Sequence, residues 1–248
     1  MDAPAADAPG GRGRVPRVLV VTAVQVEAEA VAAGTAGATG AARRPRVDVL
    51  AGGVGPAAVA AATATALAGA SAAGDPYTLV VSAGIGGGFA PHAPLGSVVV
   101  AAEIVAADLG ADTPDGYLAV EELGFGRSTH RPPAALAAAM ARSLAACPDF
   151  PSLLAPVLTV STVTGTARRT VELASRHPRA AAEGMEGFGV AEAAAVHRLP
   201  CAEVRAISNT VGPRDRAAWR IGPALAALKG AFSLLNPVFE ETFDDRRP

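Results

Sequence analysis

Three polar residues stand where apolar strand-like or helix-like segments begin or end, and each could do chemistry there. Glu27 follows the first β-branched run, VLVVTAV, and Glu186 opens an alanine-rich segment; Asn209 ends the run VRAIS. A carboxylate can activate water or accept hydrogen bonds from the two hydroxyls of a ribose, and a carboxamide can pair with the edge of a base. Structural alternatives stay open: a glutamate favoured by a helix dipole at 27, a helix cap at 186, and an Asx turn at 209.

Two glycine clusters follow the second and third predicted strands, GGVGP at 52–56 and AGIGGG at 83–88. Glycine lets a backbone approach a ligand closely and present its N–H groups. Neither cluster has the G-x-G-x-x-G spacing of a dinucleotide loop or the G-K-[ST] ending of a triphosphate loop. They predict either a close approach to a ligand or tight turns without one.

The elements that must position these residues alternate along the chain. Apolar, β-branched runs predict strands over 15–24, 46–50, 77–82, 96–107, 157–161 and 202–208, and alanine-rich segments predict helices over 25–33, 56–70, 132–146, 166–176, 187–197 and 217–235. This alternation predicts an α/β fold with a mostly parallel central sheet. Ligands bind such sheets at the carboxyl ends of the strands, so the residues after each strand are the candidates.

We expect a single domain over residues 15–237. The Pro/Gly/Ala-rich segment 1–14 is predicted to be a disordered N-terminal tail, and 238–248 a C-terminal tail. The segment 108–131 is the least regular part and is predicted to be a long loop.

Composition excludes several classes of protein. Half of the 248 residues are hydrophobic and the net charge is -2, so nothing favours nucleic acid or an anionic membrane as a partner. Lys229 is the only lysine, which argues against a phosphate-loop or Schiff-base lysine. Cys147 and Cys201 are predicted to be buried thiols of a reducing compartment, and without a targeting segment we expect a cytoplasmic location. Four scattered histidines predict no metal site, and we expect no cofactor.

Several motifs, in one order, resemble a known family. They are GGVG, SAGIGGGFAP, PLGSVVV, EGMEGFGVAEAA and VRAISN, within the stretch from Arg17 to Leu235. The order is similar to the purine nucleoside phosphorylase and nucleosidase superfamily, above all to its hydrolase branch, typified by the methylthioadenosine/S-adenosylhomocysteine nucleosidases. Within that branch, the ending ISNTVGPRDRAAW resembles the futalosine hydrolases, which release hypoxanthine from futalosine in an alternative menaquinone pathway. The resemblance implies a three-layer α/β/α fold with a mixed, mostly parallel sheet.

The resemblance also implies roles for individual residues. Glu27 matches the glutamate that deprotonates the attacking water, and Glu186 matches the one that holds the ribose hydroxyls. Met185 matches a methionine that packs beside the sugar. The family usually has a bulky aromatic in its purine-holding segment, where this chain has Gly165. The remaining matches, to the segments near the ribose and the base, are Gly86, Gly87, Thr164, Gly165 and Thr166.

Asn209 is an instructive departure from the adenine-releasing members, which carry an aspartic acid at that place. A protonated aspartic acid donates to purine N7 and accepts from the 6-amino group of adenine. An asparagine amide instead donates to the 6-carbonyl of hypoxanthine, while its oxygen accepts from N7–H. Asn209 therefore favours hypoxanthine as the leaving base. An asparagine cannot supply the proton, so water or Asp215 is the candidate donor.

Hydrolysis is favoured over phosphorolysis. A phosphorylase holds a phosphate dianion, usually with an arginine near the end of the third strand, and here that strand ends at Ser82 with no arginine beside it. Glu27 would also repel the anion. An adenine-releasing nucleosidase, a phosphorylase and an inactive nucleoside-binding protein of the same fold are the alternatives.

The substrate of the resembled enzymes bears a carboxyphenyl tail on its 5' side. Arg214 could pair with that carboxylate, and Trp219 or Phe89 could cover the aryl ring. The alternative is that Arg214 and Asp215 pair with each other at a helix start. The resemblance also suggests a homo-oligomer, a dimer or larger.

Overall fold

The computed structural model describes residues 16–36 and 45–244, so the predicted tail over 1–14 lies outside the described residues. Its strands are β1 (Arg17–Thr22), β2 (Arg46–Ala51), β3 (Leu79–Gly88), β4 (Val98–Ala106), β5 (Gly110–Thr113), β6 (Gly116–Ala119), β7 (Thr129–His130), β8 (Ser152–Thr159), β9 (Ala182–Gly184) and β10 (Cys201–Thr210). Its helices are α1 (Gln25–Thr35), α2 (Pro56–Ala72), α3 (Ala134–Ala145), α4 (Ala167–Arg176), α5 (Gly187–Val196), the 3-10 turn η1 (Arg216–Ala218) and α6 (Ile221–Asp244).

The large sheet is mixed and partly closed on itself. Its order is β10-β4-β8-β9-β3-β1-β2, and β10 also pairs with β3, so β3, β9, β8, β4 and β10 form a ring of five strands. The β1–β2, β1–β3, β3–β10, β4–β8 and β8–β9 pairs are parallel, and β4–β10 and β3–β9 are antiparallel. The α/β fold with a mixed sheet is confirmed.

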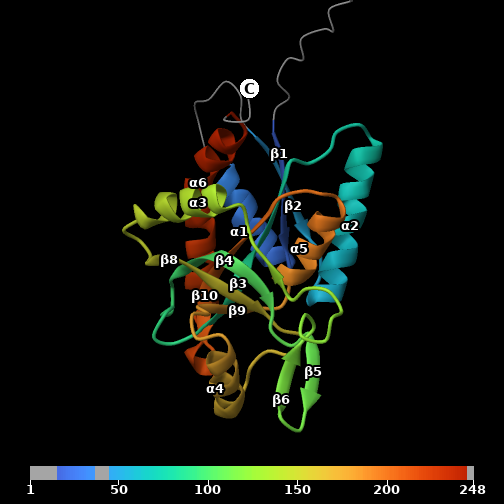
Figure 1. Cartoon of the computed structure of the whole chain (residues 1–248). Helices are drawn as coiled ribbons and strands as arrows, with labels where there is room; N and C mark the ends of the chain where they lie inside the picture. The colour runs from blue at the N-terminus through green and yellow to red at the C-terminus, as the bar shows by residue number, and fades with distance from the viewer. Residues whose placement is uncertain (1–15, 37–44, 245–248) are drawn as a thin grey trace, which may run out of the picture.

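Helices cover both faces of the sheet, and the strand sequences show why (Figure 1). Val18 and Val20 of β1 point into the core cluster built by α1, α3 and α6, whereas Leu19 and Val21 point into the cluster built by α2 and α5. Alternate residues of a strand face opposite sides, so a strand that is apolar at every position is buried on both.

Four elements differ most from the sequence prediction. The strand predicted over 157–161 begins earlier, at Ser152, as β8. The third strand was predicted to end at Ser82, but β3 continues through the glycine cluster to Gly88, because those residues pair with β10 and β9. The region 108–131 is not one long loop: it contains the β5–β6 hairpin and β7. The last helix was predicted to end at residue 235 and a tail to begin at 238, but α6 runs to Asp244 with Pro237 inside it.

Residues 221–240 of α6 are long and apolar enough, by length and composition alone, to cross a bilayer. The same helix, however, places Leu228, Phe232, Leu235 and Phe239 in the largest core cluster, where each is fully buried. Its apolar character is therefore explained by packing against the sheet and α1.

Candidate active site

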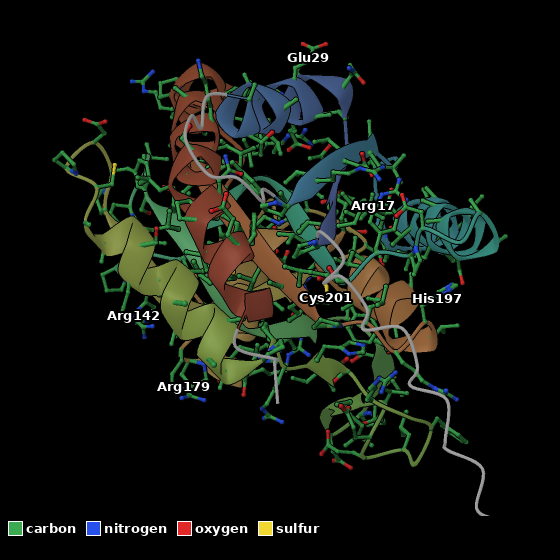
Figure 2. All side chains as sticks on the ribbon, turned by 90° about the horizontal axis from the view of Figure 1, so that it is seen from above. Arg17, Glu29, Arg142, Arg179, His197 and Cys201 are labelled. Atoms are coloured by element: carbon green, nitrogen blue, oxygen red, sulfur yellow. The ribbon has the colours of Figure 1, made fainter. Side chains whose placement is uncertain are left out.

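Glu27 is buried where β1 meets α1, and three backbone groups hold its carboxylate. The N–H groups of Ala23 and Val24 donate to Oε2 at 3.0 and 3.3 Å, and the N–H of Ile85 on β3 donates to Oε1 at 2.8 Å. Only 3% of the residue is exposed. Glu29, the other glutamate of this turn, points away from the molecule (Figure 2). The two glutamates of this turn therefore have different environments.

Glu186 stands at the start of α5 but does not cap that helix with its side chain. Its Oε1 accepts from the N–H of Gly55 at 3.2 Å, and its Oε2 accepts from Arg205 Nη1 at 3.0 Å. Gly55 has φ of 90°, a backbone conformation that favours glycine, so the first glycine cluster makes a turn and also presents an N–H to a carboxylate. The helix-cap alternative for the Glu186 side chain is wrong.

Arg205 is the residue that sequence reasoning missed. It lies on β10 with 1% of its surface exposed, and its guanidinium donates to Glu186, to Glu203 Oε1 at 2.8 Å and to Ser82 Oγ at 3.1 Å. The expectation that no arginine lies beside the end of the third predicted strand is therefore wrong. Arg205 lies on β10, the parallel neighbour of β3, and reaches Ser82 at that point. The pattern E-x-R within an apolar strand was the available signal, since alternate residues share a face.

The charges around Arg205 are unbalanced. One guanidinium meets the buried carboxylates of Glu186 and Glu203, and Glu27 lies close enough to act on it. Burial alone would lower the pKa of Arg205, but the surrounding carboxylates raise it, so the side chain stays charged. Burial raises the pKa of Glu203, against the opposing effect of Arg205. We call Glu27, Glu186, Glu203 and Arg205 the acid cluster.

Gly84 separates Glu27 from Arg205 on β3. A Cβ built on Gly84 would lie 2.7 Å from Glu27 Oε1 and 2.9 Å from Arg205 Nη1. A side chain at this position would displace the ends of Glu27 and Arg205, so the glycine lets both charged groups approach the strand. The second glycine cluster is thus a strand segment to which functional groups come close, and not a turn.

A cavity of about 90 Å³ lies near the far end of the same strands. Asn209, Thr164, Arg214 and Trp219, all singled out from the sequence, line it. We call it the base cavity, after the purine recognition that the family resemblance predicts for Asn209 and Thr164. The complete lining is Leu95, Val163, Thr164, Gly165, Asn209, Thr210, Gly212, Pro213, Arg214, Asp215, Ala218 and Trp219.

Asn209 has a defined orientation in this cavity. Its Oδ1 accepts from Ser208 Oγ at 2.9 Å, and its Nδ2 donates to the carbonyl of Thr210 at 3.2 Å. An amide nitrogen carries two hydrogens, so one donor of Asn209 remains for a ligand. Asn209 lies close to Gly87, on which a Cβ would come within 3.2 Å of its Nδ2.

Of the remaining predicted residues, Gly165, Arg214 and Asp215 line the base cavity and the others do not. Arg214 lies over the ring of Trp219 at 5.6 Å, and Asp215 accepts from the N–H of Ala217; no Arg214–Asp215 ion pair occurs among the described residues. Phe89 is 3% exposed inside an apolar cluster and is not part of the cavity lining. Met185, Thr166, Gly86 and Gly87 also lie outside that lining. Met185 is half-buried and its N–H donates to Glu186, whereas Thr166 is exposed and caps α4. The two glycines belong to β3.

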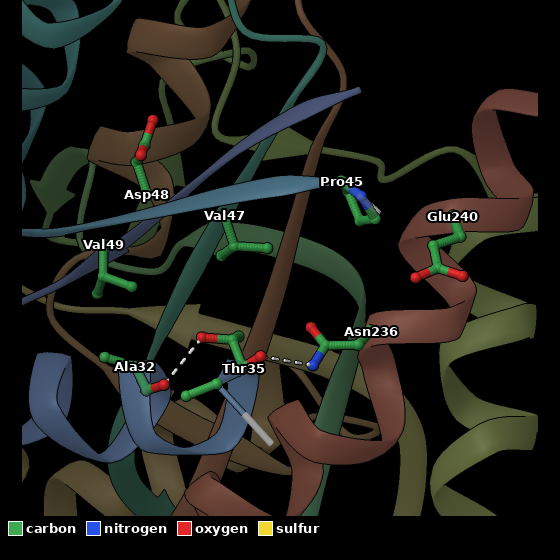
Figure 3. A pocket seen from close by; sticks show the side chains of 9 residues that line it. Ala32, Thr35, Pro45, Val47, Asp48, Val49, Asn236 and Glu240 are labelled. Atoms are coloured by element: carbon green, nitrogen blue, oxygen red, sulfur yellow. Dashed lines mark hydrogen bonds between the residues drawn. The ribbon is translucent and has the colours of Figure 1, made fainter. Parts of the chain in front are cut away.

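A more open groove of about 570 Å³ lies between α1, β2 and α6 (Figure 3). None of the predicted site residues lines it, and its Asp48 is already paired with Arg17 at 2.6 Å.

No group of metal-ligating side chains occurs in the described parts of the chain. Cys147 and Cys201 are free and half-buried, not fully buried as expected. The cytoplasmic location inferred from them stays a prediction.

Comparisons with known proteins place this chain in a family. The family model described as the phosphorylase superfamily matches residues 10–228. The chain also resembles, with a TM-score of 0.71, a methylthioadenosine/S-adenosylhomocysteine nucleosidase from Colwellia psychrerythraea 34H. That match has 20% identity and covers 91% of this chain and 95% of the other, so it supports the fold alone. The chain belongs to the phosphorylase superfamily.

Curated relatives define the branch more closely. A futalosine hydrolase of Streptomyces coelicolor is 58% identical over 232 residues, covering 90% of this chain and 96% of the relative. A futalosine hydrolase of Acidothermus cellulolyticus is 42% identical over 225 residues, covering 88% and 89%. Within the superfamily, the chain is a member of the futalosine hydrolase family.

Proposed function

We propose that this protein hydrolyses the N-ribosidic bond of futalosine, releasing hypoxanthine and leaving dehypoxanthine futalosine, as a step of an alternative menaquinone pathway. The high identity to a futalosine hydrolase over nearly the whole chain supports the substrate. The observation that carries the reaction type is Glu27, a buried carboxylate held by three backbone N–H groups at the edge where the strands end.

The proposed reaction adds water across the bond between C1' and the base. As that bond lengthens, positive charge develops on the ribosyl ring, and Glu27 takes a proton from the attacking water. The hydroxide bonds to C1', and the base departs with a proton supplied by water or Asp215. Oε2 of Glu186 already accepts from Arg205 and from the N–H of Met185, whereas Oε1 accepts only from Gly55. Because each carboxylate oxygen has two lone pairs, Oε1 keeps one with which to accept a ribose hydroxyl.

The charge of the acid cluster supports hydrolysis over phosphorolysis. Its cation, Arg205, is fully buried and already donates to two carboxylates and Ser82. A phosphate dianion would meet an excess of carboxylates with no free guanidinium to neutralise it. A water molecule is neutral, so the carboxylates do not repel it.

The orientation of Asn209 supports hypoxanthine over adenine. Its oxygen accepts from the Ser208 hydroxyl and keeps a second lone pair for N7–H, and one N–H remains for the 6-position of the base. The 6-carbonyl of hypoxanthine accepts that hydrogen, whereas the 6-amino group of adenine offers another donor. A mismatched buried polar pair costs about 1–3 kcal/mol.

A base-release assay tests the proposal. The protein is incubated separately with futalosine, inosine and methylthioadenosine, with and without phosphate, and free base is measured by chromatography. We expect hypoxanthine from futalosine at a rate independent of phosphate. Adenine from methylthioadenosine without hypoxanthine from futalosine would indicate the nucleosidase alternative, and a dependence on phosphate would indicate a phosphorylase.

We also propose that the protein forms a homo-oligomer. Phe125 is 79% exposed and, with Leu109 and Phe188, lines an open groove, which offers apolar surface for a second copy. Light scattering on the purified protein measures its mass, and a monomer at micromolar concentration would contradict this proposal.

A further inference from the structure

Glu183 on β9 is a buried carboxylate with no role in the reaction described so far. Only 4% of this residue is exposed. Both of its oxygens meet one residue, because the N–H of Thr164 donates to Oε1 at 2.9 Å and the Thr164 hydroxyl bonds Oε2 at 2.5 Å. Thr164 is also buried, and it lines the base cavity.

The sheet register places Glu183 and Asn209 on either side of one glycine. Gly87 pairs with Glu183 of β9 on one side and with Asn209 of β10 on the other. Directly paired residues project to the same face of a sheet, so the two polar side chains share a face with only Gly87 between them. The Glu183–Thr164 pair therefore belongs to the same recognition surface as Asn209.

Other contacts already fix the segment that carries Thr164. Asp108 Oδ2 accepts from the N–H of Ser161 at 2.7 Å, and the N–H of Val160 donates to the carbonyl of Gly184 at 3.0 Å. At its far end, the Thr166 side chain caps α4. The Thr164 hydroxyl is not needed to hold the backbone in place, so its bond to Glu183 chiefly sets the direction in which that hydroxyl donates.

That direction has a chemical consequence. An ionised carboxylate only accepts, so the Thr164 hydroxyl must give its hydrogen to Glu183 and can offer only lone pairs to a ligand. N1 of a 6-oxopurine carries a hydrogen, whereas N1 of adenine carries a lone pair. We propose that Glu183 is a positioning residue that fixes the Thr164 hydroxyl as an acceptor and thereby makes the base cavity prefer a 6-oxopurine. This inference rests on the proposed function, since it requires a purine in that cavity.

Glu183 can also be protonated, and its surroundings affect the pKa at which this happens. Burial raises the pKa of its carboxyl, while the two Thr164 donors and Arg169 on α4 lower it and Asp108 raises it. A protonated Glu183 would donate to the Thr164 oxygen, and the Thr164 hydroxyl could then turn its hydrogen to the cavity. The preference for a 6-oxopurine is therefore present above the pKa of Glu183 and weakens as pH falls through it.

Competitive inhibition of futalosine hydrolysis by hypoxanthine and by adenine tests the inference. The variant Glu183→Gln is nearly isosteric and places an amide donor against Thr164, so it imitates the protonated state. We expect it to lower the preference for hypoxanthine over adenine about tenfold, the worth of one hydrogen bond of this kind. Thr164→Val should lower it similarly, and Thr164→Ser should retain it.

Asp108→Asn is the matched control, because it loosens the same segment at Ser161 without touching the Thr164 hydroxyl. It should leave the ratio of the two inhibition constants unchanged, and circular dichroism should show that all variants fold. If Glu183→Gln and Thr164→Val keep the wild-type ratio, or if Asp108→Asn changes it equally, the inference is overturned. If the wild-type enzyme releases no hypoxanthine from futalosine, the proposed function itself fails, which is a separate result.

Discussion

The acid cluster and the base cavity both include residues of β10 but are built in opposite ways. The acid cluster is charged and almost completely buried, and backbone N–H groups and Arg205 hold its carboxylates. The base cavity is formed largely by neutral groups and by exposed residues between β10 and α6, such as Arg214. Groups that stabilise a transition state must be fixed in advance, whereas groups that recognise one substrate can lie on loops. The difference predicts that changes in the first region affect rate and stability, and changes in the second affect selectivity.

The largest expected effect comes from Glu27. Glu27→Gln keeps the size of the side chain but removes the base, and we expect kcat to fall about 100- to 10,000-fold with little change in KM. Steady-state kinetics on futalosine measure this. Glu29→Gln is the matched control, because Glu29 is exposed on the same turn, and it should retain wild-type kcat. Unchanged turnover in Glu27→Gln would contradict the catalytic role.

Arg205 tests whether the acid cluster also holds the fold together. Arg205→Met leaves Glu186 and Glu203 buried without their cation, and we expect the free energy of unfolding to fall by about 3–5 kcal/mol. Urea denaturation followed by circular dichroism measures the loss. The control is Arg142→Met, because Arg142 is exposed on α3 and points outward (Figure 2). Equal stability of the two variants would mean that the buried ion pairs contribute nothing net.

The same contrast explains what the sequence could reveal. The α/β fold could be predicted because its strands are apolar at nearly every position and its helices are rich in alanine. Glu27, Glu186 and Asn209 could be chosen because a polar residue that follows an apolar strand is conspicuous. The sequence could not show that Glu27 and Glu186 belong to the acid cluster and Asn209 to the base cavity, because that arrangement depends on β10 pairing with both β3 and β4.

Arg205 and Glu183 were overlooked for a related reason. Each lies inside a strand, where a charged residue suggests an exposed face, yet both are buried in the folded chain. Burial of a charge is set by partners distant in the chain, such as Thr164 for Glu183. Such partners leave no local pattern in the sequence.

In the base cavity, Asn209 should govern which base leaves. Asn209→Asp gives the group that adenine-releasing relatives carry, and we expect the ratio of kcat/KM for futalosine to that for its adenine counterpart to fall about tenfold or more, since a mismatched buried pair costs about 1–3 kcal/mol. The stability should stay at the wild-type value, because Asn209 is only half-buried. A variant that loses stability but keeps its selectivity would place Asn209 with the structural residues instead.

The smallest expected effect comes from Arg214 at the exposed rim. Its guanidinium lies over Trp219 at 5.6 Å, and a carboxylate on the 5' side of the substrate could pair with it in contact with water. Exposed ion pairs contribute about 0.2–1 kcal/mol, so Arg214→Ala should raise KM for futalosine about two- to fivefold with kcat unchanged. Arg216→Ala removes a neighbouring exposed arginine that does not line the base cavity, and it should have no such effect. Inosine has no carboxylate tail, so its KM should be the same in both variants; a matching rise for inosine would show that Arg214 supports the cavity and not the tail.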